Sequence, residues 1–163
     1  KIYFPREVLP ISYVTSQLVN MLLSFLVVFL VLLLAGKGLD PYALLFLPIV
    51  VLIEYLLAMG FCMIFSALTV YLRDLEYLLG IFILAWQFLS PIMYDITMVP
   101  EEIMPIFEIN PMTPIIIAYR DILFYQKAPE LSTLTSASVF GVVIVVLGFL
   151  IFGKLQKHFA EEM

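Results

Sequence analysis

Long apolar runs separated by short polar clusters make up most of this chain. Residues 18–36 and 131–153 contain no charged side chain, and residues 41–72 contain only Glu54. A helix needs about 20 mostly apolar residues to cross the hydrocarbon core of a bilayer. The pattern therefore predicts an all-α integral membrane protein.

Turn-forming clusters set the limits of four predicted spans. Residues 36–41 end the first run, residues 73–76 end the second, and Ser90-Pro91 followed by Asp95 closes the third. Pro48 is expected to kink the second span. The predicted transmembrane helices are residues 16–35, 42–72, 77–94 and 134–153.

Residues 95–130 have a different sequence pattern, because five prolines divide them into apolar pieces too short to cross a membrane. One short helix is expected to begin at Pro100 with Glu101-Glu102 in its first turn. A second is expected at Thr113-Pro114, with the threonine as N-cap. The break between them at Asn110-Pro111 predicts a re-entrant helical hairpin on the outer side.

Lysines and arginines in the span flanks predict the orientation. One side holds five of them (Lys1, Arg6, Arg73, Lys154 and Lys157), and the other holds three (Lys37, Arg120 and Lys127). Cytoplasmic flanks carry the excess of these residues. Both ends of the chain are therefore expected in the cytoplasm, with the hairpin outside.

Composition removes several classes of function. The chain is 64% hydrophobic and 13% charged, and its net charge of −5 includes no basic stripe, so nucleic acid is not an expected partner. The single cysteine, Cys62, lies in an apolar run, and we expect neither a disulfide nor a metal site. None of the seven glycines belongs to a Gly-x-x-x-x-Gly-Lys-Ser/Thr loop, so any ATP is expected to be hydrolysed by a separate subunit.

Glu54 is an acid expected near the bilayer centre, about 20 Å of helix beyond Pro41. An ionised carboxylate there costs at least ~2.5–3.5 kcal/mol. It could carry protons, which would make the protein a proton-coupled transporter. It could instead be a structural carboxyl hydrogen-bonded to a neighbouring helix. The sequence leaves both interpretations open.

Four-residue spacing places aromatic and polar side chains on one face of the third predicted span. These residues are Phe82, Trp86, Ser90 and Tyr94, with Gln87 beside them. Sugar rings stack on such surfaces, so the face could line a glycan path. The alternative is ordinary packing, with Tyr94 in the interfacial aromatic belt.

Residues 4–10 predict one short helix, which Pro5 opens and Pro10 ends. It is either an interfacial anchor, with Arg6 at the lipid headgroups, or a lever pressed by a cytosolic partner.

Five segments in order resemble the type-2 ABC exporter permeases, most closely the branch that exports O-antigen, capsule or teichoic acid polymers. They are residues 3–10, Tyr71-Leu72-Arg73-Asp74, Ser90-Pro91-Ile92-Met93-Tyr94, Asn110-Pro111 and Tyr119-Arg120-Asp121. The resemblance covers the whole chain and roughly the C-terminal two-thirds of a typical member. It implies six spans in all, two of them upstream of this segment.

The resemblance also implies how the permease would work. It would form a homodimer in a bacterial or archaeal cytoplasmic membrane and export a lipid-linked glycan, with ATP and Mg held by a partner ABC ATPase. Residues 1–15 would be the coupling segment and residues 16–163 the transmembrane domain. The ATPase contacts would be Phe4, Pro5, Arg6, Glu7, Arg73 and Asp74. The outer gate would include Asn110, Pro111, Arg120 and Asp121.

Three rivals remain. One is a type-2 ABC permease for a drug or other small hydrophobic molecule, the second is a proton-driven carrier built around Glu54, and the third is a membrane scaffold without transport activity. None of the four functions requires a catalytic residue in this chain.

Overall fold

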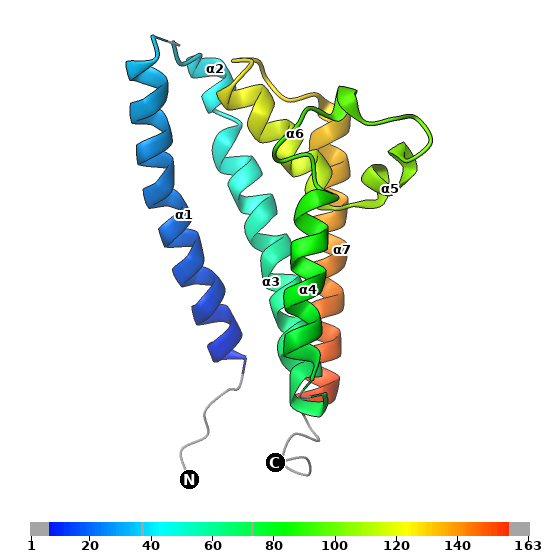
Figure 1. The fold of residues 1–163 in the computed structure, drawn as a ribbon. Helices are drawn as coiled ribbons and strands as arrows, with labels where there is room; N and C mark the ends of the chain where they lie inside the picture. The colour runs from blue at the N-terminus through cyan, green and yellow to red at the C-terminus, as the bar shows by residue number, and fades with distance from the viewer. Residues whose placement is uncertain (1–6, 37, 73, 157–163) are drawn as a thin grey trace.

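The computed structural model describes residues 7–36, 38–72 and 74–156, and its regular elements within these ranges are all helical (Figure 1). In chain order they are α1 (Val8–Leu34), α2 (Pro41–Leu44), α3 (Leu47–Tyr71), α4 (Leu75–Phe88), the 3-10 turn η1 (Ile96–Met98), α5 (Met104–Ile109), α6 (Met112–Leu123) and α7 (Leu131–Leu155).

Three of these helical stretches are long and apolar enough to cross a membrane: α1, α2 with α3, and α7. The predicted all-helical fold is therefore confirmed for the described residues, and the three long apolar stretches are consistent with an integral membrane protein. The second stretch is interrupted at Leu45-Phe46, and Pro48 lies in the first turn of α3, so the expected kink precedes the proline by about half a turn.

The third predicted span, residues 77–94, differs from the structure. The helix α4 has 14 residues and ends at Phe88, so it is about 21 Å long, less than the roughly 30 Å of a hydrocarbon core. Pro91 disfavours a helical conformation at Ser90 and cannot donate a backbone hydrogen bond. The apolar sequence continues past this point, but the helix does not, and four full-length spans are not found in the described residues.

The first helix also differs from expectation, because it runs through Pro10 without interruption. The predicted helix end at Pro10 is therefore wrong. Pro10 is the third residue of α1, where a backbone N–H has no partner inside the helix, so the missing donor costs nothing. Residues 4–6 of the predicted short helix lie outside the described residues.

The hairpin has its predicted break but different helix starts. α5 ends at Ile109 and α6 begins at Met112, which confirms the break at Asn110-Pro111. α5 begins at Met104, not at Pro100, and Glu101-Glu102 lie in the turn before it. Pro105, in the first turn of α5, supplies the competing start signal.

The start of α6 shows a further difference, because Thr113 is its second residue and not its N-cap. The N-cap position is Pro111, and the side chain of Asn110 just before it accepts a hydrogen bond from the Met112 amide (3.0 Å), three residues earlier than the expected cap.

The packing centre is the crossing of α3 and α7, which run in the same direction (Figure 1). Gly60 and Gly148 meet there, and a Cβ on Gly148 would lie 2.5 Å from the backbone oxygen of Gly60. Small residues of this kind let membrane helices approach until their backbones touch. The tight contact between α3 and α7 forms the core on which the other helices rest.

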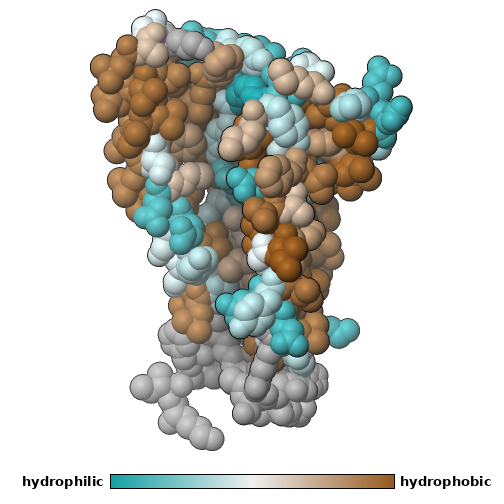
Figure 2. Space-filling model, viewed as in Figure 1, coloured by the Kyte–Doolittle hydropathy of each residue, from teal (hydrophilic) through white to brown (hydrophobic). Residues whose placement is uncertain are grey.

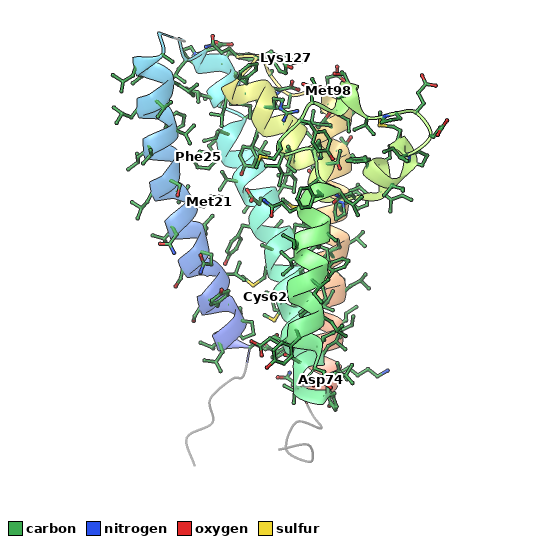
Figure 3. The ribbon with its side chains drawn as sticks, viewed as in Figure 1. Met21, Phe25, Cys62, Asp74, Met98 and Lys127 are labelled. Carbon is green, nitrogen blue, oxygen red and sulfur yellow. The ribbon has the colours of Figure 1, made fainter. Side chains whose placement is uncertain are left out.

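The two ends of the molecule are formed by different segments of the chain. α1 begins and α7 ends at one end, close to Asp74, whereas Met98 and Lys127 lie at the opposite end with the hairpin (Figure 3). Side-chain bonds close the first end: Gln156 donates to Glu7 (3.0 Å), and Tyr71 donates to the Leu155 carbonyl (2.8 Å). Both ends of the described chain thus share one side, as predicted, and the cytoplasmic identity of that side stays a prediction.

Candidate functional site

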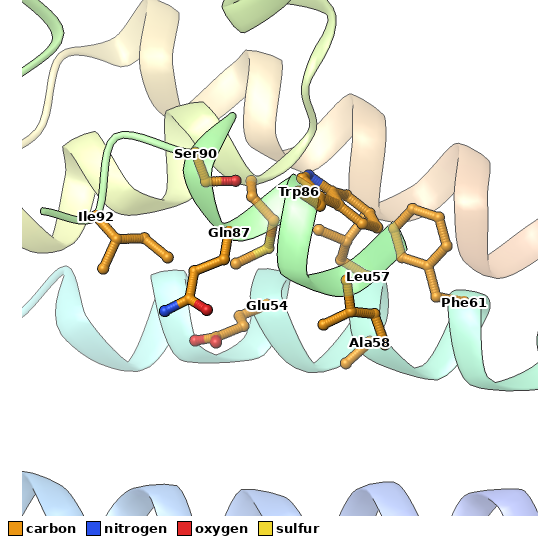
Figure 4. A pocket seen from close by; sticks show the side chains of 10 residues that line it. Glu54, Leu57, Ala58, Phe61, Trp86, Gln87, Ser90 and Ile92 are labelled. Atoms are coloured by element: carbon orange, nitrogen blue, oxygen red, sulfur yellow. The ribbon is translucent and has the colours of Figure 1, made fainter. Parts of the chain in front are cut away.

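A pocket of about 420 Å³ opens between α3, the end of α4 and the start of α6 (Figure 4). Its wall is mostly apolar, with a few polar groups that come from different elements: Glu54 from α3, Gln87 from α4 and Ser90 from the turn after α4. Pockets of about 300–1,000 Å³ with this mixture are typical of small-molecule sites. We take it as the candidate site.

The end of α4 supplies the residues that the sequence analysis grouped on one face. Trp86, Gln87 and Ser90 line the pocket, while Phe82 and Tyr94 do not. Because α4 ends at Phe88, Ser90 and Tyr94 do not continue its surface, and the prediction of one shared helix face is wrong for them.

Phe82 and Tyr94 have contacts of their own. Phe82 is 51% exposed and packs against the Trp86 ring at 5.3 Å between centroids. Tyr94 donates a hydrogen bond to the Phe88 carbonyl (2.6 Å), and its ring lies edge-on to Phe107. Tyr94 therefore secures the chain reversal beyond α4.

Asn110 fixes the position of the pocket wall. Its amide oxygen accepts hydrogen bonds from the Trp86 indole N–H (2.8 Å) and the Met112 amide (3.0 Å). Its amide nitrogen donates to the Leu89 carbonyl (2.9 Å) and the Ser90 hydroxyl (3.0 Å). All four bonding positions of a buried amide are used, so Asn110 ties the hairpin break to the end of α4.

Glu54 is partly buried and has a partner on another helix. The Tyr119 hydroxyl of α6 donates to its Oε2 at 2.5 Å, and the Tyr119 ring packs against Phe25 of α1 at 5.6 Å between centroids. This contact joins three helices and agrees with the structural interpretation of Glu54. The carboxyl also borders the pocket, where the Gln87 amide points toward it (Figure 4).

Two ion pairs lie at the hairpin end of the described residues. Arg120 donates to the Pro91 carbonyl (3.0 Å) and lies 3.5 Å from Asp95, and the buried Asp121 pairs with Lys127 at 3.2 Å. Arg120 and Asp121 are therefore not simply solvent-facing charges. Both hold the hairpin in place, and their role in a gate stays a prediction.

Asp95 is the centre of the charged cluster at the hairpin end. The Thr97 backbone amide, together with the hydroxyls of Tyr125 and Thr97, lowers the pKa of Asp95 by hydrogen bonding to its carboxylate. The same bond to Asp95 raises the pKa of Tyr125. In the sequence Asp95 served only to mark the end of a predicted span, so its role as a hydrogen-bond acceptor for several side chains was missed.

The predicted ATPase contacts lie partly outside the described residues, which exclude Phe4, Pro5, Arg6 and Arg73. Glu7 and Asp74 are described. Asp74 is exposed, and Glu7 is held by Gln156, both at the end opposite the hairpin.

Sequence reasoning also missed Tyr119 as a site residue, although it belongs to a motif that carried the family resemblance. One available signal was Glu54 itself, because an acid inside a span needs a hydrogen-bonding partner. The described residues contain no cluster of three or more potential metal ligands among His, Cys, Asp and Glu.

Comparison with known proteins gives a consistent result. Residues 1–124 match the model of the family described as ABC-2 type transporter. The chain is 29% identical over 161 residues to the O-antigen export system permease protein RfbA of Klebsiella pneumoniae, covering 99% of this chain and 62% of that protein. It is 28% identical over 165 residues to RfbA of Myxococcus xanthus, covering 100% of this chain and 63% of that protein.

Proposed function

Because the chain belongs to the ABC-2 type transporter family, we propose that it is the core of a permease subunit that exports lipid-linked cell-surface polysaccharide, driven by a separate ATPase. One observation carries the proposal: relatives named as O-antigen export permeases align with 99–100% of the chain. The chain spans less than two-thirds of those relatives' length, so the substrate and partners of the whole protein are part of the proposal.

The membrane passage proposed for this chain has four crossings and an outer hairpin. The parallel course of α3 and α7 supports a fourth crossing, because the chain must return to the hairpin end before α7 can begin. α4 makes most of this return, and the segment after it, fixed by Asn110 and Arg120, completes it. The lysine and arginine distribution supports a cytoplasmic location for the opposite end.

In this arrangement the proposed ATPase contacts are Phe4, Pro5, Arg6, Glu7, Arg73 and Asp74. Of these, the described residues Glu7 and Asp74 lie at the end opposite the hairpin. A permease homodimer in the cytoplasmic membrane would bring two such ends to two ATPase subunits, which bind ATP and Mg. Arg6→Glu should reduce export and substrate-stimulated ATP hydrolysis while membrane insertion stays normal. Full export by this variant would favour the alternative interpretation of this segment, an interfacial lipid anchor.

The glycan path includes the pocket at the end of α4. Trp86, held by Asn110, and Phe61, edge-on to it at 5.0 Å between centroids, form an aromatic wall. Aromatic surfaces bind sugar C–H groups without a fixed register, which suits a polymer that has to slide. Trp86→Ala should slow the export of long chains, and Trp86→Phe should largely restore it.

The function is tested with the full-length protein. Co-purification with an ABC ATPase, and loss of surface polysaccharide on deletion of the permease, are the expected results. Unchanged surface polysaccharide together with loss of drug efflux would favour the small-molecule permease. Export that requires a proton gradient but no ATP would favour the proton-coupled carrier.

A further inference from the structure

Glu54 stands at the junction of two pockets. The pocket at the end of α4 lies on one side of it, and a second pocket of about 310 Å³, between α1 and α3, lies on the other. Glu54 and Ala58 line both, and Gln17 of α1 lines the second. Figure 2 shows the corresponding hollow between α1 and the remaining helices.

The carboxyl of Glu54 is oriented but not saturated. Tyr119 donates one hydrogen bond to Oε2, and this bond fixes the carboxyl relative to α6. A carboxylate has about four acceptor positions, so most of its capacity is left for groups in the two pockets. An acid that served only to join α3 to α6 would not need to border two pockets.

The groups around Glu54 select the chemistry of a ligand. Gln17 and Gln87 each offer an amide donor and an amide acceptor, Ser90 offers a hydroxyl, and Trp86 stands behind them. No lysine or arginine lines either pocket among the described residues, which disfavours an anionic ligand. An organic cation would use the carboxylate but not the amide donors. A neutral ring with several hydroxyls would use them all.

We propose that Glu54 contacts the exported glycan directly: its carboxylate accepts hydrogen bonds from the hydroxyls of a sugar ring, beside Gln87, and Tyr119 acts as the positioning residue for the carboxylate. This inference rests on the proposed function and gives Glu54 a role that is neither proton transport nor helix packing alone.

Trp86 lines the same pocket and is the single tryptophan of this chain, so its fluorescence can report occupancy. The test uses the full-length permease with its ATPase, with maltohexaose as a neutral polyhydroxyl probe and tetraphenylphosphonium as a cationic probe. Trp86→Phe identifies the part of the signal that comes from this site. Assembly with the ATPase is checked by size-exclusion chromatography, so that binding is compared only between folded complexes.

Maltohexaose should change the Trp86 signal, and Glu54→Leu should weaken this binding by about tenfold or more. Glu54→Gln, which keeps an acceptor for Tyr119 and for hydroxyls, should weaken it by only a few-fold, and Tyr119→Phe should give an intermediate loss. The matched control is Glu108→Leu, which changes an exposed acid on α5 and should leave binding unchanged.

Two results would overturn the inference: a wild-type signal that responds to tetraphenylphosphonium but not to maltohexaose, or equal maltohexaose binding by wild type and Glu54→Leu. Export assays in the same strain separate this failure from failure of the proposed function. If surface polysaccharide depends on the permease and Glu54→Leu exports normally, only the inference falls. If deletion of the permease leaves surface polysaccharide intact, the function falls.

Discussion

Gly148→Ala should destabilise the protein more than an alanine at either of the other two glycines of α7, Gly141 and Gly153. A Cβ on Gly148 would lie 2.5 Å from the backbone oxygen of Gly60 and 2.9 Å from its Cα. Ordinary contacts begin at 3.4 Å, so the two helices would have to separate by roughly 1 Å. Backbone atoms cannot rotate aside as a side chain can.

The size of the effect follows from the packing that is lost. Overpacking of this kind costs about 1–3 kcal/mol, and a gap of 0.5–1 Å forfeits roughly a quarter to a half of the attraction between the affected atoms. Because α3 and α7 form the tightest contact of the fold, we expect a loss near the upper limit, about 3 kcal/mol. Gly60→Ala should behave alike, since its Cβ would lie 2.5 Å from the Ile144 carbonyl.

The control lies on the same helix. Gly153 has no atom within 4 Å of an added Cβ, so Gly153→Ala should leave stability unchanged or raise it, because alanine favours helix by up to about 1 kcal/mol. Unfolding by titration with SDS in mixed micelles gives the free-energy difference between each variant and the wild type. If Gly148→Ala proved as stable as Gly153→Ala, the close approach of α3 and α7 would be refuted.

Three further predictions test other parts of the molecule. In a Cys62→Ser background, cysteine introduced by Gln126→Cys should react with an impermeant reagent added outside intact cells, and cysteine introduced by Gln156→Cys should not; the reverse pattern would overturn the orientation. Asn110→Leu should lower the unfolding free energy by roughly 3 kcal/mol in the same titration, because it leaves the Trp86 indole and the Leu89 carbonyl without their hydrogen-bond partner. An unchanged unfolding free energy would show that Asn110 does not fix the pocket wall. The pKa of Asp95 is lowered in the folded protein, so the ionised carboxylate stabilises the fold above the usual carboxyl pKa of about 3.9, and this stabilisation is lost as the pH falls through the folded pKa. Asp95→Asn should therefore lower the melting temperature equally at pH 5 and pH 8. A difference between the two pH values would contradict this assignment.

The long helices could be predicted from the sequence because they depend on local composition. Runs without charge located α1 and α7 to within eight and three residues of their starts. The end of α4 could not be located so well, since the run stays apolar beyond it. Apart from the local bond of Tyr94 to the Phe88 carbonyl, the contacts that hold the chain reversal are remote: Asn110 and Arg120 bind the carbonyls of Leu89 and Pro91 from 21 and 29 residues away.

The site was predicted in part for the same reason. Trp86, Gln87 and Ser90 were found because they are close in sequence, and Glu54 was found because an acid stands out in an apolar span. That these groups meet in one pocket depends on how α3, α4 and α6 pack, and the partner of Glu54 lies 65 residues further along the chain. Periodicity along a single helix carries no information on such contacts.

The close contact between α3 and α7 has a mechanical consequence for the pocket. The wall that α3 contributes is stiff, because separating two touching backbones forfeits packing along both helices. The wall that α4 contributes is held differently: no residue of α4 is buried, and Asn110 fixes its end through the Trp86 indole and the Leu89 carbonyl. Breaking these hydrogen bonds would therefore let this wall move outward with little loss of packing, while Glu54 keeps its place.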